Sequence, residues 1–170
     1  MPLLRRPRSI THAQKNHDAV RLIGAAVREQ FEALGHFVPP NVIFAGQVSD
    51  GELRALLESA LCVGCLSTTE GFGLPPLEGM VLGCPAIMAP CGALSEVGGK
   101  SALFAAPDQP EQWVTAIRRL ADEPDYWTYY SRAGRERATQ FTWKRAGEQL
   151  LGVIKEVAVA KASKGRWQHQ

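Results

Sequence analysis

The stretch EGFGLPPLE (residues 70–78) decides the fold, because it joins a predicted buried strand to the start of a predicted helix. The strand is expected at Leu61–Leu66, an apolar run without alternation, as in a parallel strand covered on both faces. The helix is expected from about Pro76 to Leu82, since proline suits the first helical turn. Ligands of open α/β sheets bind beyond the carboxyl ends of the strands. The sequence therefore predicts a ligand site at residues 70–78.

The residue types in this stretch suit a ligand that carries both phosphate and hydroxyl groups. Gly71 and Gly73 let the backbone approach a ligand closely, and the helix N-terminus is expected to present free N–H groups to a diphosphate. Glu70 and Glu78 flank the stretch, and carboxylates repel phosphate, so hydroxyls are their useful targets. A purely structural interpretation competes, in which the glycines only make a tight turn and Glu78 is a solvated helix residue. The dinucleotide and Walker fingerprints are absent from the sequence.

Strands and helices alternate on both sides of this stretch. Ser49 and Glu52 form a capping-box pattern that predicts the start of a helix. The remaining elements are read from apolar periodicity. Strands are expected at Asn41–Val48, Pro85–Ala89 and Ala102–Ala106, and helices at Gln112–Leu120, Tyr126–Gln140 and Lys144–Val159. This rhythm predicts an α/β fold, a Rossmann-like doubly wound parallel sheet flanked by helices.

The two ends of the chain are organised differently from its middle. Residues 1–40 are expected to form a shortened N-terminal part of the Rossmann-like unit, in which Asp18–Leu34 is either one helix or contains a strand at Arg21–Ala25. Residues 41–160 are expected to hold the binding core and the C-terminal helices. Residues 161–170 are basic and aperiodic, which is typical of a disordered tail.

Composition limits the classes of partner. The chain has 170 residues, a length that fits one domain, and a net charge of +2, which is too small for a nucleic-acid-binding surface. Its longest apolar runs are far too short to span a bilayer, and the first eight residues show no signal-peptide core. We expect a cytoplasmic protein, with the inner face of the membrane as an alternative location.

Four cysteines raise the question of a metal or redox site. Cys62 and Cys65 have C-x-x-C spacing, but residues three apart on a strand point to opposite faces and cannot easily share a metal. No histidine lies near them in the sequence. Buried free thiols are therefore the favoured interpretation, and zinc is the alternative.

The sequence also resembles a known family. EGFGLP, with Glu78 eight residues after Glu70, is similar to the E-x7-E signature of retaining GT-B glycosyltransferases (glycosyl transferases group 1), which include bacterial mannosyltransferases. Four further stretches resemble family segments: NVIFAGQVSD (41–50), LGCPA (82–86), LSEVGG (94–99, the family's "LPEV-G" loop) and FTWKRA (141–146). The resemblance runs from about Asn41 to Ile154. It implies the C-terminal, donor-binding domain of such an enzyme.

The resemblance implies a role for each matching residue. Glu70 would contact hydroxyls of the transferred sugar and stabilise positive charge at its anomeric carbon, and Glu78 would bind the ribose. Val48 would touch the base, and Lys15 resembles one member of the basic pair that contacts the diphosphate. Ser95 stands where the family has proline, which changes the expected shape of that loop. The backbone amides that would hold the sugar and diphosphate are those of Gly71, Phe72, Gly73 and Leu74.

Three functions remain open at this point. The first is the donor half of a retaining glycosyltransferase for bacterial polysaccharide or glycolipid synthesis, using a nucleotide sugar, with GDP-mannose favoured, and no metal or other cofactor. The second is an inactive nucleotide-sugar-binding module, and the third is a nucleotide-sugar 2-epimerase on the same fold. The resemblance covers only a C-terminal domain, so we expect a partner that supplies the N-terminal acceptor-binding domain, and no transfer by this chain alone. Self-association and peripheral membrane association are also left open.

Overall fold

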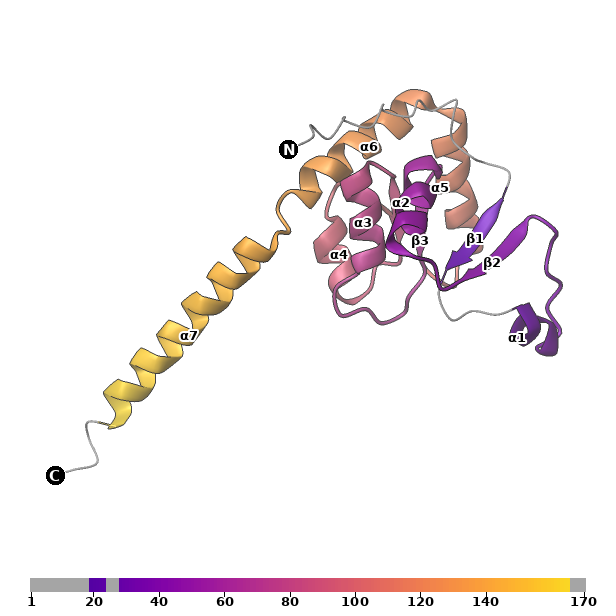
Figure 1. Cartoon of the computed structure of the whole chain (residues 1–170). Helices are drawn as coiled ribbons and strands as arrows, with labels where there is room; N and C mark the ends of the chain where they lie inside the picture. The colour runs from indigo at the N-terminus through magenta and orange to yellow at the C-terminus, as the bar shows by residue number, and fades with distance from the viewer. Residues whose placement is uncertain (1–18, 24–27, 166–170) are drawn as a thin grey trace.

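The computed structural model describes residues 19–23 and 28–165, and the side chains as far as Lys161. These residues form parallel strands flanked by helices, with one long helix that projects from the rest (Figure 1). The elements in chain order are β1 (Val20–Ile23), α1 (Arg28–Ala33), β2 (Val42–Gly46), α2 (Asp50–Ser59), β3 (Val63–Cys65), α3 (Leu74–Leu82), β4 (Ala86–Met88), α4 (Gly92–Gly98), β5 (Leu103–Phe104), α5 (Pro110–Asp122), α6 (Pro124–Ala138) and α7 (Trp143–Gly165).

All the strand pairs are parallel, which confirms the predicted α/β class. Strands β3, β4 and β5 form one sheet in that order, and β1 and β2 pair as a separate two-stranded sheet. Val63 lies opposite Ala86, and Ile87 lies opposite Leu103. Strand β1 also decides between the two interpretations of Asp18–Leu34, because that region contains a strand followed by the short helix α1 and not a single helix.

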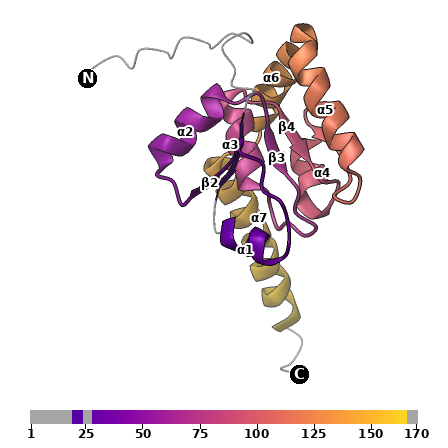
Figure 2. The same cartoon turned by 90° about the vertical axis from the view of Figure 1, so that its right-hand side faces the viewer.

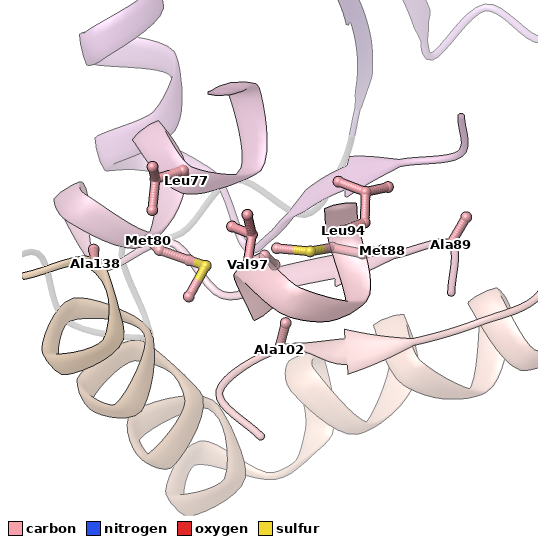
Figure 3. Packing of buried hydrophobic residues seen from close by; sticks show 9 residues of the cluster. Leu77, Met80, Met88, Ala89, Leu94, Val97, Ala102 and Ala138 are labelled. Carbon is pink, nitrogen blue, oxygen red and sulfur yellow. The ribbon is translucent and has the colours of Figure 1, made fainter. Parts of the chain in front are cut away.

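The central strand β4 is buried on both faces. Met88 belongs to a core with α3, α4 and the end of α6, and several of the residues in this core are shown in Figure 3. Ile87 points to a second core that includes Trp113 of α5 and Trp127 of α6. Figure 2 shows β3 and β4 between α3 on one side and α5 on the other. Burial on both faces explains why β4 is apolar throughout.

The start of α2 forms as the sequence predicts. The Ser49 side chain accepts a hydrogen bond from the Glu52 amide, and the Glu52 carboxylate accepts one from the Ser49 amide at 2.8 Å. Both partners lie within four residues of each other, so local sequence is sufficient to specify this cap.

Two helices differ from the sequence-based expectation. LSEVGG (94–99) is not a loop, because its first five residues lie in α4, where Leu94 and Val97 are three residues apart and both buried. The last helix, expected at Lys144–Val159, continues to Gly165, since Ala160 and Lys161 favour helix. The first five residues of the expected disordered tail are therefore helical in backbone.

Helix α7 leaves much of its apolar surface uncovered. It projects away from the two cores (Figure 1), and Leu150, Val153, Ile154 and Val157 are each more than half exposed. Trp143, at its first position, is 91% exposed. No helix among the described residues is both long enough and apolar enough to cross a membrane.

Candidate functional site

The predicted site is a glycine loop (Glu70–Leu74) between β3 and α3. Gly73 caps α3 with φ of 94° and ψ of 53°, a left-handed conformation that favours glycine. Helix α3 therefore begins at Leu74, two residues earlier than predicted. Pro75 and Pro76 occupy its second and third positions and have no N–H group. The expectation of several free N–H groups at this helix terminus is wrong, because only the Leu74 amide remains there.

The loop itself supplies the missing donors. Within residues 19–23 and 28–165, no group accepts a hydrogen bond from the amides of Gly71, Phe72, Gly73 or Leu74. Successive backbone N–H groups in a turn can form a concavity that binds an anion, and donors without protein partners are free to do so. The arrangement is thus able to hold a phosphate with backbone dipoles.

The two glycines of the loop are required for different reasons. A Cβ atom at Gly73 would lie 2.5 Å from the Cδ2 atom of Leu94, which is fully buried, in a backbone conformation that side chains rarely adopt. A Cβ atom at Gly71 would meet nothing within 4 Å, and the φ of Gly71 is not positive. The fold therefore requires glycine at 73, whereas the space beside Gly71 is open for a ligand.

This difference predicts opposite effects of two alanine substitutions. We expect Gly73→Ala to lower the free energy of unfolding by roughly 2 kcal/mol or more, from backbone strain and overpacking. Gly71→Ala should change it by less than about 0.5 kcal/mol. Urea unfolding of both variants measures the change in the free energy of unfolding. Equal destabilisation would contradict the conclusion that the fold requires glycine at 73 and not at 71.

Helix α4 holds the other side of the loop, a feature that sequence reasoning missed. The Ala93 amide donates a hydrogen bond to the Glu70 carbonyl at 3.2 Å. A Cβ atom at Gly92 would lie 2.6 Å from the same carbonyl oxygen, so glycine permits this approach. The Cys91 thiol donates to the Ser67 carbonyl. In the sequence, Gly92 and Ala93 after Cys91 were the local feature that could have indicated this contact with the Glu70 carbonyl.

The structure places most of the predicted site residues. Glu70 is half-buried in the loop, and Glu78 is exposed on the second turn of α3. Val48 is half-buried in the connection between β2 and α2. Lys15 lies outside the described residues. The roles of these four residues stay predictions.

The cysteines are all free thiols. Burial raises the pKa of the Cys62 thiol to about 12, so it stays protonated at neutral pH. The Cys65 sulfur lies 3.7 Å from the Ser67 Oγ atom. In the part of the chain that the structure describes, no three His, Cys, Asp or Glu side chains lie together in a way that could hold a metal ion.

Comparison with known proteins identifies relatives. The family described as Glycosyl transferases group 1 matches residues 10–137. The D-inositol 3-phosphate glycosyltransferase of Saccharomonospora viridis is 31% identical over 144 residues, which cover 82% of this chain and 31% of that protein. The MMP alpha-(1->4)-mannosyltransferase of Mycolicibacterium hassiacum is 35% identical over 120 residues, which cover 68% of this chain and 29% of that protein. The chain thus spans about a third of the length of these curated relatives.

Solved structures share the fold. Sucrose-phosphate synthase from Thermosynechococcus elongatus gives a TM-score of 0.70 at 24% identity, covering 82% of this chain and 38% of that one. Anabaena HepE, solved in complex with UDP-glucose, gives 0.69 at 20% identity, covering 85% and 43%. The C-terminal domain of LpcC, a group 1 glycosyl transferase family protein from Francisella tularensis, gives 0.54 at 23% identity, covering 66% and 58%.

Proposed function

Because this chain belongs to the glycosyl transferases group 1 family, we propose that it is the nucleotide-sugar-binding part of a retaining glycosyltransferase. The observation that carries the proposal is the glycine loop, in which four successive amides lack partners among the described residues. Glu70 and Glu78 flank these amides in the sequence. A ligand that carries a diphosphate between two sets of hydroxyls would suit the amides with its diphosphate and the two carboxylates with its hydroxyls. A nucleotide sugar is such a ligand.

Each residue would contribute a separate interaction in this proposal. The amides of the glycine loop would neutralise the diphosphate. Glu78 would accept hydrogen bonds from the ribose hydroxyls, and Val48 would contact the base. Glu70 would accept hydrogen bonds from the transferred sugar and stabilise positive charge at its anomeric carbon as the diphosphate leaves. Lys15 would add positive charge beside the diphosphate.

The relatives favour a hexose donor. One of them is the GDP-mannose-dependent alpha-(1-6)-phosphatidylinositol dimannoside mannosyltransferase of Mycobacterium tuberculosis, and another is the O-antigen chain mannosyltransferase RfbU of Salmonella typhimurium. We infer that GDP-mannose is the favoured donor and that the product belongs to a surface polysaccharide or glycolipid. Such synthesis would place the protein in the cytoplasm or at the inner face of the membrane.

Nucleotide binding without a metal is the direct test. We expect the chain to bind at least one of GDP, UDP and ADP in calorimetry, with an unchanged affinity in EDTA, because backbone dipoles do not depend on a metal ion. A Gly71→Ala variant is the matched control, since it should fold normally and bind more weakly. Absence of binding to all three nucleotides, or its loss in EDTA, would contradict the proposal.

A partner domain would complete the protein. We infer that an acceptor-binding domain covers the apolar side of α7, where Leu150, Val153 and Ile154 are more than half exposed. Apolar patches of this kind commonly mark interfaces. Self-association through the same surface is the competing outcome, and light scattering of the chain with and without an added acceptor-binding domain distinguishes the two.

A further inference from the structure

We propose that Phe141 is a positioning residue that holds the glycine loop in its binding shape through Phe72. The inference rests on the proposed function, since it concerns the same loop. Phe141 lies in the short connection between α6, which ends at Ala138, and α7, which begins at Trp143. It therefore links the projecting helix to the site.

The contact between the two phenylalanines is a ring pair. The Phe72 and Phe141 ring centroids lie 5.9 Å apart, with an angle of 86° between the ring planes. This is the edge-to-face geometry that aromatic pairs favour. Phe72 is 42% exposed, so its side chain is only partly covered, and Phe141 supplies part of that cover. The Phe72 amide is one of the four donors that have no partner among the described residues, so restraining its ring also restrains this donor.

Phe141 is itself fixed from two directions. Its side chain packs against the core formed by α3, β4 and α4, and its amide donates to the Ala138 carbonyl at 3.1 Å. The guanidinium of Arg137 lies over its ring, with Cζ 4.9 Å from the ring centroid. Because the Phe141 ring is held in place, it gives the Phe72 ring a defined surface to pack against.

Arg137 also supports the Glu70 end of the loop, through α4. Its guanidinium donates to the carbonyls of Glu96 at 2.6 Å and Val97 at 3.0 Å, near the end of α4. The start of α4 in turn holds the Glu70 carbonyl through Ala93. Arg137 thus contacts both supports of the glycine loop, α4 on the Glu70 side and Phe141 on the Phe72 side. A shift of the α6–α7 connection would therefore change the positions of both Glu70 and Phe72.

Two phenylalanine substitutions and their combination test this coupling. We expect Phe141→Leu and Phe72→Leu each to weaken binding of the nucleoside diphosphate that binds the unaltered chain. The loss should be about 2- to 10-fold, which corresponds to the interaction energy of one aromatic pair. The double variant should bind no worse than the weaker single variant, because both substitutions break one interaction. Phe141→Tyr, which keeps the ring, should restore binding. Phe37→Leu, at an exposed site outside the loop, is the control and should change nothing.

Two outcomes would overturn the inference. The first is multiplication of the two single losses in the double variant, which would mean that Phe72 and Phe141 affect binding independently of each other. The second is unchanged amide chemical shifts of Gly71 and Gly73 in the nitrogen-15 spectrum of unliganded Phe141→Leu. This spectrum separates the inference from the proposed function, because it requires no nucleotide. If Phe141→Leu does not fold, Phe72→Leu breaks the same pair from its exposed side, and an unchanged affinity of this variant for the nucleoside diphosphate is then the contradicting result.

Discussion

The chain on its own is expected to transfer no sugar from a nucleotide sugar to an acceptor. Transfer requires an acceptor hydroxyl held beside the anomeric carbon while the diphosphate leaves, and such positioning can supply about 7–11 kcal/mol of the barrier. The described residues form one α/β unit, and the motifs that the sequence shares with the family all belong to the donor side. The effect would be a loss of roughly five or more orders of magnitude in rate relative to a two-domain enzyme.

The measurement is incubation of purified chain with labelled GDP-mannose and UDP-glucose and a crude pool of glycolipid and oligosaccharide acceptors. Adding an acceptor-binding domain from a relative should produce turnover if the proposed partner is correct. Turnover by the chain alone at a rate of order 1 per second would contradict the expectation. Slow release of free sugar would not contradict the expectation, because water can take the place of the acceptor without being held in position.

Alanine substitutions of the two glutamates should separate nucleotide binding from sugar binding. If Glu78 holds the ribose, Glu78→Ala removes a charged hydrogen bond and should weaken binding of free nucleoside diphosphate by about 1.5–3 kcal/mol. Glu70→Ala should leave this affinity nearly unchanged and weaken only the sugar conjugate. Calorimetry with GDP and GDP-mannose, or with UDP and UDP-glucose, measures both affinities.

The structure provides a control for this pair. Glu111 is an exposed glutamate on α5, outside the glycine loop, and Glu111→Ala should change neither affinity. Glu78 is exposed on α3, so its substitution should leave the fold intact and any loss can be assigned to binding. Equal losses of free nucleotide in Glu70→Ala and Glu78→Ala would show that the proposed division of roles is wrong.

The parts of the fold that depend on local sequence were predicted well. Ser49 and Glu52 specify the start of α2 because they bond to each other. The apolar run that becomes β4 indicated a strand buried on both faces, and β4 is buried throughout. The same expectation for Leu61–Leu66 was wrong, because β3 is the edge strand of its sheet, with Gly64 exposed and Val63 and Cys65 only half-buried. The helix of seven residues, α4, was missed because two buried side chains, Leu94 and Val97, are too few to show a helical period. The division of the strands between two sheets is a long-range property that no single segment encodes.

The site was predicted as a position in the chain, but only partly as an arrangement in space. The sequence indicated that the stretch beginning at Glu70 lies between a strand and a helix, and the structure confirms this placement. It did not indicate that Gly73 adopts a left-handed conformation, which moves the helix start to Leu74 and places both prolines in the first turn. The pairing of Phe72 with Phe141 could not be predicted from the sequence either, because it joins segments that are distant in the sequence.

The projecting helix α7 divides the molecule into two regions of different local stability. The amides of β4 and α3 lie within packed cores, so their hydrogen exchange requires opening of much of the domain. The amides of α7 beyond Trp143 are protected chiefly by the helix itself, and a helix whose side chains from Trp143 to Lys161 are all exposed opens readily in water. Phe141 and the hydrogen bond from its amide to Ala138 mark the boundary between the two regions. Covering α7 with a partner would therefore extend the cooperative unit across this boundary, so that docking and ordering of the helix become one event.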